Sequence, residues 1–539
     1  MRKTRIKKVF AMFLATIMLA SGAVAAAASP VDAGLLPLRA IFEAGGATVE
    51  WNEDDRTIHV EAPQVSIVFH TNQPVAYVNG TAVDLQNGVV LWEGQAFISE
   101  ADLMLALSPP IDLAGLDDSD IARLFMQGFV AGDILGILQL LSDEMQAYAE
   151  AFAEMYAYTV IGRGNFVDWA LEDEQIHEGG INFYFATTNT TGRGAYLVFV
   201  NDNGLVDGFF DQGFVFEPIF PADDANYTAE AVVVGEGTPW ALDGLLTMPR
   251  GASAENPVPA VVLVHGSGAG NMDQSIFDNR PFHDIATYLS SNGIAVIRYN
   301  KRVLTHGAAY VKAFGENATV WEETIEDALL AAKILQADPR ISRVYVAGLS
   351  LGGILAPRIA EEGGLDGAIL LAAPARALFE VQYEQNLLSI NSALEMGLIS
   401  QAEADEIFAM IAGLLEEARN LPNMTEQELQ NALIFGIPAV WQRSYLDSLP
   451  IPIISRNVIP TLILHGDRDW QVSTERDFKR FVEYVGDYDH VTTILYNNVN
   501  HILMQSQTDF DDLRDYAPLG NVYKGLLQDI VRWINGNRD

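Results

Sequence analysis

The chain has 539 residues, of which 49% are hydrophobic, and its formal net charge is −39, from 32 basic and 71 acidic residues. This length exceeds what one hydrophobic core ordinarily serves and predicts two or three domains, while the acidic balance argues against a partner made of nucleic acid or anionic lipid. The absence of cysteine excludes disulfides, thiolate metal sites and a cysteine nucleophile.

Residues 1–28 have the composition of an export signal. Five basic residues precede an apolar stretch over residues 9–20, and small residues follow over residues 23–29. This order is typical of a signal peptide that signal peptidase removes; the alternative is an uncleaved membrane anchor, because Ser21 and Gly22 interrupt the apolar stretch only weakly. Since an exported chain without disulfides fits the outside of a bacterial cell, we expect a secreted or cell-surface bacterial protein with no membrane segment after signal cleavage.

Residues 30–110 are predicted to form a small β-rich domain. We expect a short helix that Gly45 and Gly46 end, two strands around an acidic turn, and a hairpin turn at Asn79-Gly80. The expected elements are a helix over residues 36–44 and strands over residues 47–51, 57–60 and 75–78.

The segments LPLRAIFEAGGATVEWNEDDRTIHV and AYVNG of this domain resemble the copper amine oxidase N-terminal-like, or stalk, domain of secreted bacterial proteins. Despite its name, that family implies no copper site. His59 and His70 are the histidines of this region, and a surface position explains them better than metal binding.

Residues 115–215 are predicted to form a second small domain of α+β class. Helical periodicity over residues 121–125 and 134–141 precedes strands over residues 181–185 and 195–200. Asp202-Asn203-Gly204 resembles a fragment of a calcium loop, but no downstream ligand set follows, so a hairpin turn is the better interpretation. The region resembles the small α+β domain that often precedes extracellular hydrolases.

From Phe216, near-continuous apolar runs alternate with helical stretches, as in parallel strands that are buried on both faces. Residues 216–539 are therefore predicted to form an α/β domain with a doubly wound, mostly parallel sheet covered by helices. The alternation stops over about residues 380–450, a helix-rich region with acidic faces that we interpret as a helical cap over the carboxyl edge of the sheet. Pro450 and Pro452 are expected to lead back to the next strand. The predicted strands are residues 261–264, 294–297, 344–347, 368–371 and 462–464, and the predicted helices are residues 283–292, 321–337 and 354–362.

The motif Gly348-Leu349-Ser350-Leu351-Gly352 follows a predicted strand and precedes a predicted helix. In that context G-x-S-x-G is typical of a nucleophile elbow, a tight turn that presents the serine hydroxyl at a helix amino terminus. The alternative is a glycine-rich strand–helix turn in a Rossmann-like domain. We predict that Ser350 is a nucleophile.

A serine nucleophile requires a base, and His501 lies in a loop after a late strand, where that base is expected. The competing histidines are less well placed. His265 opens the loop after the first central strand, His465 ends a strand and more simply orders its loop, and His490 precedes its strand, at the opposite edge of the sheet.

The acid that orients the imidazole is expected in the loop GDRDWQV, which offers Asp467 and Asp469. We favour Asp469 for its position in the loop, and the order Ser350, Asp469, His501 is the α/β-hydrolase order. For the oxyanion hole we predict the backbone N–H of Leu351 and that of Ser267 in the loop HGSGAG.

The region from about residue 227 to the end resembles the α/β-hydrolase family, specifically bacterial carboxylesterases with an inserted helical cap. The resemblance is carried by VVLVHGSGAGNMDQ, NRPFHDIATYLSSNGIAVIRYNKR, VYVAGLSLGGILAPRIA, ILLAAPAR, LILHGDRDWQV and NVNHILM. It implies hydrolysis of short acyl esters through an acyl-enzyme, without cofactor or metal. Asn300 stands where relatives often carry aspartate, and Leu349 where histidine is frequent, which leaves the polarity of the pocket open.

These observations predict a serine carboxylesterase acting on small-molecule esters. One alternative is a serine aminopeptidase-like hydrolase, in which acidic cap residues such as Glu395 and Glu406 would bind the peptide amine. Another is a protein that binds the cell wall through its first two domains, with a vestigial hydrolase. A metalloenzyme has little support, because no H-E-x-x-H motif or paired histidine spacing occurs.

Overall fold

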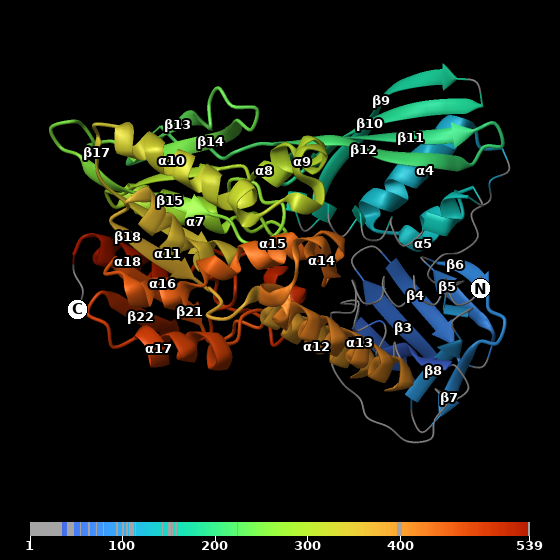
Figure 1. The fold of residues 1–539 in the computed structure, drawn as a ribbon. Helices are drawn as coiled ribbons and strands as arrows, with labels where there is room; N and C mark the ends of the chain where they lie inside the picture. Colours follow the sequence, from blue (N-terminus) through green and yellow to red (C-terminus); the bar gives the residue numbers. More distant parts are fainter. Residues whose placement is uncertain are drawn as a thin grey trace. The chain divides into compact units, whose positions relative to one another are not determined.

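The computed structural model describes residues 35–536, apart from some positions between residues 40 and 178, residue 224 and residues 396–400. The predicted signal peptide and most of the predicted helix over residues 36–44 lie outside the described residues. The chain divides into two compact units: one holds the residues up to Phe216 and also Leu388–Glu406, and the other holds Glu217–Leu387 and Ile407–Asp539. Figure 1 shows the elements of both units along the chain.

The first part of the amino-terminal unit consists of two antiparallel sheets around a core that includes Leu38, Ile67 and Phe69. Val78 of β5 pairs with Thr81 of β6, while Asn79 of the predicted turn at Asn79-Gly80 lies outside the described residues. The strands are β1 (Leu35–Pro37), β2 (Thr48–Asn52), β3 (Thr57–Ala62), β4 (Val65–His70), β5 (Val75–Val78), β6 (Thr81–Asp84), β7 (Val89–Trp92) and β8 (Gln95–Ser99).

The prediction that the first helix begins at Leu36 was wrong. Leu36 and Pro37 belong to strand β1, which pairs with Phe97–Ser99 of β8. Pairing with a distant strand outweighs the local preference of this segment, and it places Leu38 directly after β1 in the buried core.

The second part of this unit is a four-stranded antiparallel sheet with helix α4 packed against it. Aromatic rings fill the space between the helix and the sheet; the ring centroids of Phe129 and Phe209, for example, are 4.8 Å apart. Residues 202–205 join β11 to β12, so Asp202-Asn203-Gly204 belongs to a hairpin connection, as expected. The elements are α4 (Asp118–Ala131), α5 (Ile134–Leu138), η2 (Met145–Tyr148), β9 (Phe166–His177), β10 (Gly180–Asn189), β11 (Gly192–Asn201) and β12 (Val206–Phe216).

The carboxyl-terminal unit contains an eight-stranded sheet in the order β13-β14-β16-β15-β17-β18-β21-β22. The first two strands are antiparallel to their neighbours and the other six are parallel, so the predicted mostly parallel sheet is confirmed. The strands are β13 (Tyr227–Val234), β14 (Leu242–Pro249), β15 (Val258–Val264), β16 (Ala295–Tyr299), β17 (Ile341–Leu349), β18 (Gly367–Leu371), β21 (Thr461–Gly466) and β22 (Val491–Tyr496).

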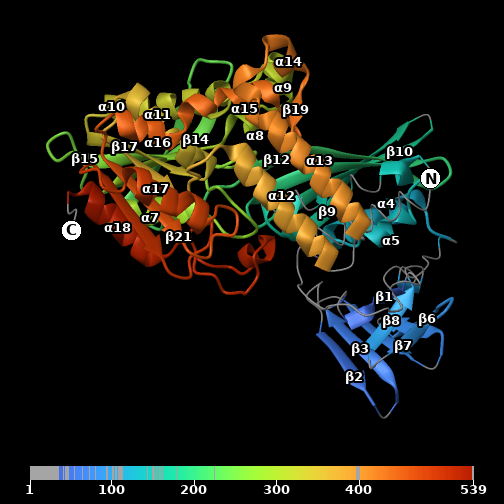
Figure 2. The ribbon, with the colours of Figure 1, turned by 60° about the horizontal axis from the view of Figure 1, so that its bottom comes forward.

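Helices cover both faces of this sheet (Figures 1 and 2). In β15, Val261 and Leu263 face a core shared with α7 and α18, whereas Val262 and Val264 face a core shared with α10 and α11. Strands with two buried faces carry uninterrupted apolar runs, which is why they were visible in the sequence. The covering helices are α7 (Pro281–Ser291), α10 (Glu326–Ala337), α11 (Leu351–Gly363), α17 (Lys479–Val485) and α18 (Lys524–Ile534).

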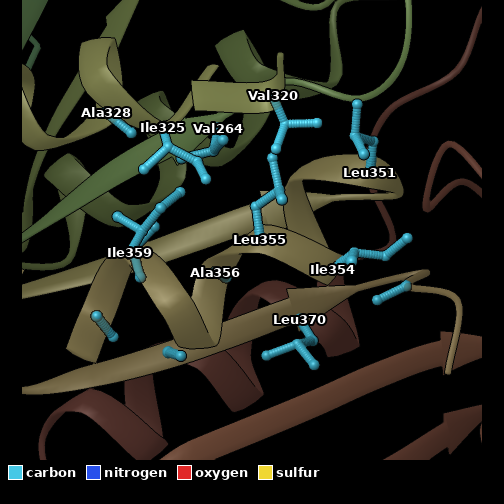
Figure 3. Packing of buried hydrophobic residues seen from close by; sticks show 14 of the residues in the cluster. Val264, Val320, Ile325, Ala328, Leu351, Ile354, Leu355, Ala356, Ile359 and Leu370 are labelled. Atoms are coloured by element: carbon cyan, nitrogen blue, oxygen red, sulfur yellow. The ribbon is translucent and has the colours of Figure 1, made fainter. Parts of the chain in front are cut away.

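Helix α11 begins directly after Ser350 and lies against the sheet along most of its length. Leu351, Leu355 and Ile359 of this helix belong to one buried cluster with Val264 of β15 and Ile325, and Figure 3 shows side chains of this cluster along the helix. This packing fixes the helix and therefore the residue at its amino terminus.

A helical insertion, residues 378–456, separates β18 from β21. Pro450 was predicted to lead back to the next strand, but a helix comes first: Pro450 is the first residue of α16. Proline suits this position because the N–H of the first helical residue has no partner within the helix, so its absence costs nothing. The insertion contains α12 (Leu378–Glu395), α13 (Gln401–Arg419), η5 (Leu421–Asn423), α14 (Glu426–Asn431), β19 (Leu433–Ile434), β20 (Ile437–Pro438), α15 (Ala439–Ser444), η6 (Leu446–Ser448) and α16 (Pro450–Arg456).

The remaining helices of the carboxyl-terminal unit are short segments. None of the described helices combines the length and apolar character that a bilayer span requires. The short segments are α8 (Arg302–Thr305), α9 (Gly307–Phe314), η3 (Gly315–Asn317), the π-helical η4 (Trp321–Ile325) and η7 (Thr474–Phe478), and η8 (Leu513–Tyr516).

Candidate active site

The turn between β17 and α11 holds Ser350 in a strained backbone conformation, with φ 54° and ψ −115°. The two glycines of the motif make this turn possible because neighbouring backbones approach them closely. A Cβ atom on Gly348 would lie 2.0 Å from the carbonyl oxygen of Gly352, and one on Gly352 would lie 2.3 Å from that of Val264. Strain of this kind is concentrated at functional sites.

Backbone hydrogen bonds fix Ser350 at the amino terminus of α11. Its N–H donates to the carbonyl oxygen of Leu371 at 2.9 Å, and its own carbonyl accepts from the N–H groups of Gly353 and Ile354. Leu351, predicted to supply an oxyanion donor, is the first residue of the helix. The N–H groups and dipole of a helix amino terminus favour negative charge at this place.

Asp469 lies in the loop after β21, and its carboxylate is fully buried. Its Oδ1 accepts the backbone N–H of Gln471 at 3.0 Å and that of Val472 at 2.8 Å. Its Oδ2 lies 2.8 Å from Nδ1 of His501. The loop thus holds one carboxylate oxygen and leaves the other for the imidazole.

Asp467, the competing acid, has a different partner. Its Oδ1 accepts the backbone N–H of Asn498 at 2.6 Å, three residues before His501. The structure therefore brings together Asp469 and His501, the pair favoured from sequence, and places Asp467 as a support of the histidine loop.

The loop that carries His501 is held by a buried carboxylate that was not singled out in the sequence. Oδ2 of Asp515 accepts from Nδ2 of Asn500 at 2.8 Å, and its Oδ1 accepts from the hydroxyls of Ser506 and Thr508 at 2.5 and 2.8 Å. Asn500 in turn accepts the N–H of Met504. Asp515 lies 15 residues from Asn500 in the chain, so only the folded loop reveals this relationship.

The acid loop and the histidine loop touch directly. A Cβ atom on Gly466 would lie 2.0 Å from the carbonyl oxygen of Val499, which also accepts the N–H of Arg468 at 3.0 Å. Glycine at position 466 is therefore required for the two loops to meet.

The other histidines near the strand ends bind backbone carbonyls. Nε2 of His265 lies 3.0 Å from the carbonyl oxygen of Asn271, and Nε2 of His465 lies 3.0 Å from that of Val472. Nε2 of His490 lies 3.2 Å from the carbonyl oxygen of Ile454. Burial, with a smaller contribution from the Lys301 ammonium, lowers the pKa of His265 to about 3, and burial also lowers the pKa of His465. Both are consistent with structural, uncharged imidazoles.

The loop after β15 lies beside the nucleophile. A Cβ atom on Gly266 would be 3.5 Å from Cβ of Ser350, and the N–H of Gly266 donates to Oε1 of Gln274 at 3.3 Å. Ser267, the second predicted oxyanion donor, follows Gly266 at the exposed surface of this loop. Gln274, a buried residue with φ 50°, was not singled out in the sequence.

Residues after β16 support the same loop. Oδ1 of Asn300 accepts the N–H of Met272 at 2.9 Å, and Nζ of Lys301 donates to the carbonyl oxygen of Gly266 at 3.0 Å. Asn300 thus has a structural role through its amide, and Leu349 is the buried last residue of β17.

The start of the helical insertion is tied to the acid loop by a group of charged residues. The guanidinium of Arg376 donates to both oxygens of buried Asp477 and to Glu384 of α12. Nε2 of Gln385 donates to the carbonyl oxygen of Gln471, the residue whose N–H contacts Asp469. Within the described residues, no group of three or more His, Asp or Glu side chains is arranged to hold a metal ion.

Comparisons with known proteins bear on both parts of the chain. Residues 25–106 match the family model "Copper amine oxidase N-terminal domain", and residues 261–513 match "Alpha/beta hydrolase family". The curated relative "Esterase EstD" from Thermotoga maritima is 31% identical over 419 residues, which are 77% of this chain and 94% of EstD.

Solved structures also match. Est1E from Butyrivibrio proteoclasticus is 16% identical over 56% of this chain and 95% of its own, with a TM-score of 0.35. The acylaminoacyl peptidase of Pyrococcus horikoshii is 14% identical over 67% of this chain and 56% of its own, with a TM-score of 0.39.

Proposed function

The chain belongs to the alpha/beta hydrolase family, preceded by a copper amine oxidase N-terminal domain, and on this basis we propose that it is a serine carboxylesterase. Ser350 is the nucleophile, His501 the general base and Asp469 the acid that orients it. The observation that carries this assignment is the 2.8 Å contact between His501 Nδ1 and a carboxylate whose other oxygen is held by two backbone N–H groups.

The proposed reaction has two acyl-transfer steps. His501 removes the proton from Ser350 Oγ as that oxygen attacks the ester carbonyl, and Asp469 stabilises the imidazolium that forms. The N–H groups of Leu351 and Ser267 stabilise the tetrahedral oxyanion, which collapses as the imidazolium protonates the departing alcohol. Water, activated by His501, then releases the acid from Ser350. The chemistry requires no cofactor.

An ester substrate is supported by the relationship to EstD, which extends over 94% of that esterase. The helical insertion is proposed to be a cap that restricts the acyl group to short chains, because it enters between strands β18 and β21 and its first helix contacts the acid loop through Gln385. Small-molecule esters of short acids are therefore the proposed substrates.

The proposal is tested with p-nitrophenyl esters of increasing chain length and the variant Ser350→Ala. We expect acetate and butyrate to be hydrolysed faster than longer esters by the wild type, and the variant to lose nearly all activity. Aminoacyl-p-nitroanilides are the comparison substrates. Equal activity in Ser350→Ala would overturn the assignment, and faster amide than ester hydrolysis would identify a peptidase instead.

We further propose that the protein is exported and acts at the outside of a bacterial cell. The basic, apolar and small-residue order of residues 1–28 supports export. Export is tested by fractionating cells that express either the full chain or the chain without residues 1–28. Retention of the full-length chain in the cytoplasm would contradict export.

Binding of the cell wall by the amino-terminal domains is a separate proposal. A pull-down of the full chain with cell walls tests it.

A further inference from the structure

Lys301 is a buried cation next to the nucleophile loop. The residue lies two positions after the end of strand β16 and is 1% exposed. Its ammonium donates to the carbonyl oxygen of Gly266 at 3.0 Å and lies 2.6 Å from Oε1 of Glu323. A buried ammonium is costly unless it is paired, so both contacts are needed to keep it there.

The peptide group that Lys301 contacts is the one that carries the proposed oxyanion donor. The carbonyl of Gly266 and the N–H of Ser267 belong to one planar trans peptide, in which they point in opposite directions. Holding the carbonyl oxygen therefore fixes the direction of the N–H. A cation at the carbonyl oxygen also draws electron density from the amide, which makes its N–H a stronger hydrogen-bond donor.

Glu323 links this cation to the helical insertion. Its Oε2 accepts from Nε1 of Trp441 at 2.5 Å, and Trp441 belongs to α15. Glu323 itself lies in η4, a π-helical turn, which is a form that is frequent at functional sites. The contacts thus run from α15 through Glu323 and Lys301 to the Gly266–Ser267 peptide.

We propose that Lys301 is a positioning residue of the oxyanion hole, which orients and polarises the Gly266–Ser267 peptide, and that Trp441 and Glu323 couple this function to the helical insertion. The inference rests on the proposed esterase function and adds a residue to that site. A purely structural role for the ion pair is the alternative, and it predicts loss of stability without a selective loss of transition-state binding.

The test compares Lys301→Met, Lys301→Arg and the control Lys333→Met, which removes an exposed lysine on α10. For each variant we measure the thermal midpoint of unfolding, and kcat and KM for p-nitrophenyl butyrate. The concentration of active sites, to which kcat refers, is obtained by titration with a fluorophosphonate. The third measurement is the inhibition constant of a trifluoromethyl ketone. That ketone forms a hemiketal whose oxyanion occupies the hole, so its affinity reports on the donors directly.

We expect Lys301→Met to lower kcat per titrated site by about tenfold to hundredfold, less than the loss of a donor itself. The inhibition constant of the ketone should rise by the same factor while KM changes little. Lys301→Arg should recover part of both, and Lys333→Met should match the wild type. A Lys301→Met enzyme whose kcat and ketone affinity stay within about twofold of the wild type overturns the proposal, as does a change confined to the thermal midpoint.

Trp441→Phe and Glu323→Gln keep the proposal testable if Lys301→Met does not fold. Both should weaken ketone binding and kcat in parallel, by a smaller factor than Lys301→Met; unchanged values in both overturn it. Failure of the esterase function itself has a different signature, namely wild-type turnover no faster than that of Ser350→Ala, and that result overturns both proposals.

Discussion

Nδ1 of His501 lies 2.8 Å from Oδ2 of Asp469, whereas Asp467, two residues earlier in the same loop, binds the backbone of Asn498. The two carboxylates of one short loop therefore serve two purposes. In the proposed mechanism Asp469 sets the tautomer and orientation of the imidazole, and Asp467 supports the loop that carries it.

This difference predicts unequal effects of two matched variants. Asp469→Asn should lower kcat by about a thousandfold to ten-thousandfold, because an amide stabilises the wrong imidazole tautomer. Asp467→Asn should cost less than about tenfold, since only a loop contact to a backbone N–H is weakened. Steady-state kinetics with p-nitrophenyl butyrate measure both, and the reverse ranking would make Asp467 the acid.

Asp515 should matter for activity although it is not part of the proposed triad. In Asp515→Asn an NH2 group takes the place of one carboxylate oxygen, either the one that accepts from Asn500 or the one that accepts from the two hydroxyls. The variant should lower the free energy of unfolding by about 1–3 kcal/mol. It should also lower kcat by about tenfold, because the loop that carries His501 is held less firmly. The control is Asp511→Asn, whose carboxylate is 65% exposed and should contribute little. Equal effects of the two variants on kcat would show that Asp515 does not position His501.

Two glycine-to-alanine substitutions should change the stability of the protein in opposite directions. Gly466→Ala forces a Cβ atom to within 2.0 Å of the Val499 carbonyl and should separate the acid and histidine loops, with loss of soluble protein or of nearly all activity. Gly413→Ala, at an exposed position of α13 with open space around the new Cβ, should stabilise the helix by about 0.5–1 kcal/mol. Expression yield, thermal midpoint and activity distinguish the two, and a fully active Gly466→Ala would contradict the tight contact of the loops.

Acid should destabilise the hydrolase unit through its buried histidines. The pKa of His265 is about 3 in the folded protein and ordinarily about 6.5, so below pH 6.5 the unfolded chain gains a proton that the folded chain does not. Stability should therefore fall by about 1.4 kcal/mol per pH unit for this residue as the pH drops from 6.5 toward 3, and His465 should add to the effect in the same direction.

The measurement is urea unfolding between pH 7.5 and 5, followed by the loss of esterase activity. His265→Gln should reduce the pH slope of the unfolding free energy relative to the wild type. A slope that His265→Gln does not alter would show that the imidazole titrates normally in the folded state.

Much of the fold was predictable because burial on both faces of a parallel sheet leaves a clear pattern in the sequence. The strand at residues 261–264 is an uninterrupted apolar run since alternate residues face two different cores. Strand β9 escaped prediction for the opposite reason: it is an edge strand, and most of its residues, several of them acidic, are exposed. The hairpin of β19 and β20 also escaped, because its turn places Phe435 at φ 50°, a conformation that its residue type does not favour.

The candidate site divides in the same way. Ser350, Asp469 and His501 lie in loops that follow strand ends, so motif and chain order indicate them as candidates. Lys301 was not predictable as a partner of Gly266, because the two residues are 35 positions apart and their contact depends on how neighbouring strands end. Roles that rest on tertiary contacts between loops become visible only in the structure.

Covalent labelling provides a direct test of whether the imidazole of His501 activates the hydroxyl of Ser350. Wild type and His501→Ala are mixed with a fluorophosphonate, and the adduct is located by peptide mass spectrometry while the labelling rate is followed. We expect a single adduct on Ser350 in the wild type and labelling slower by about a thousandfold or more in His501→Ala. An adduct on another residue, or labelling of His501→Ala at the wild-type rate, would contradict it.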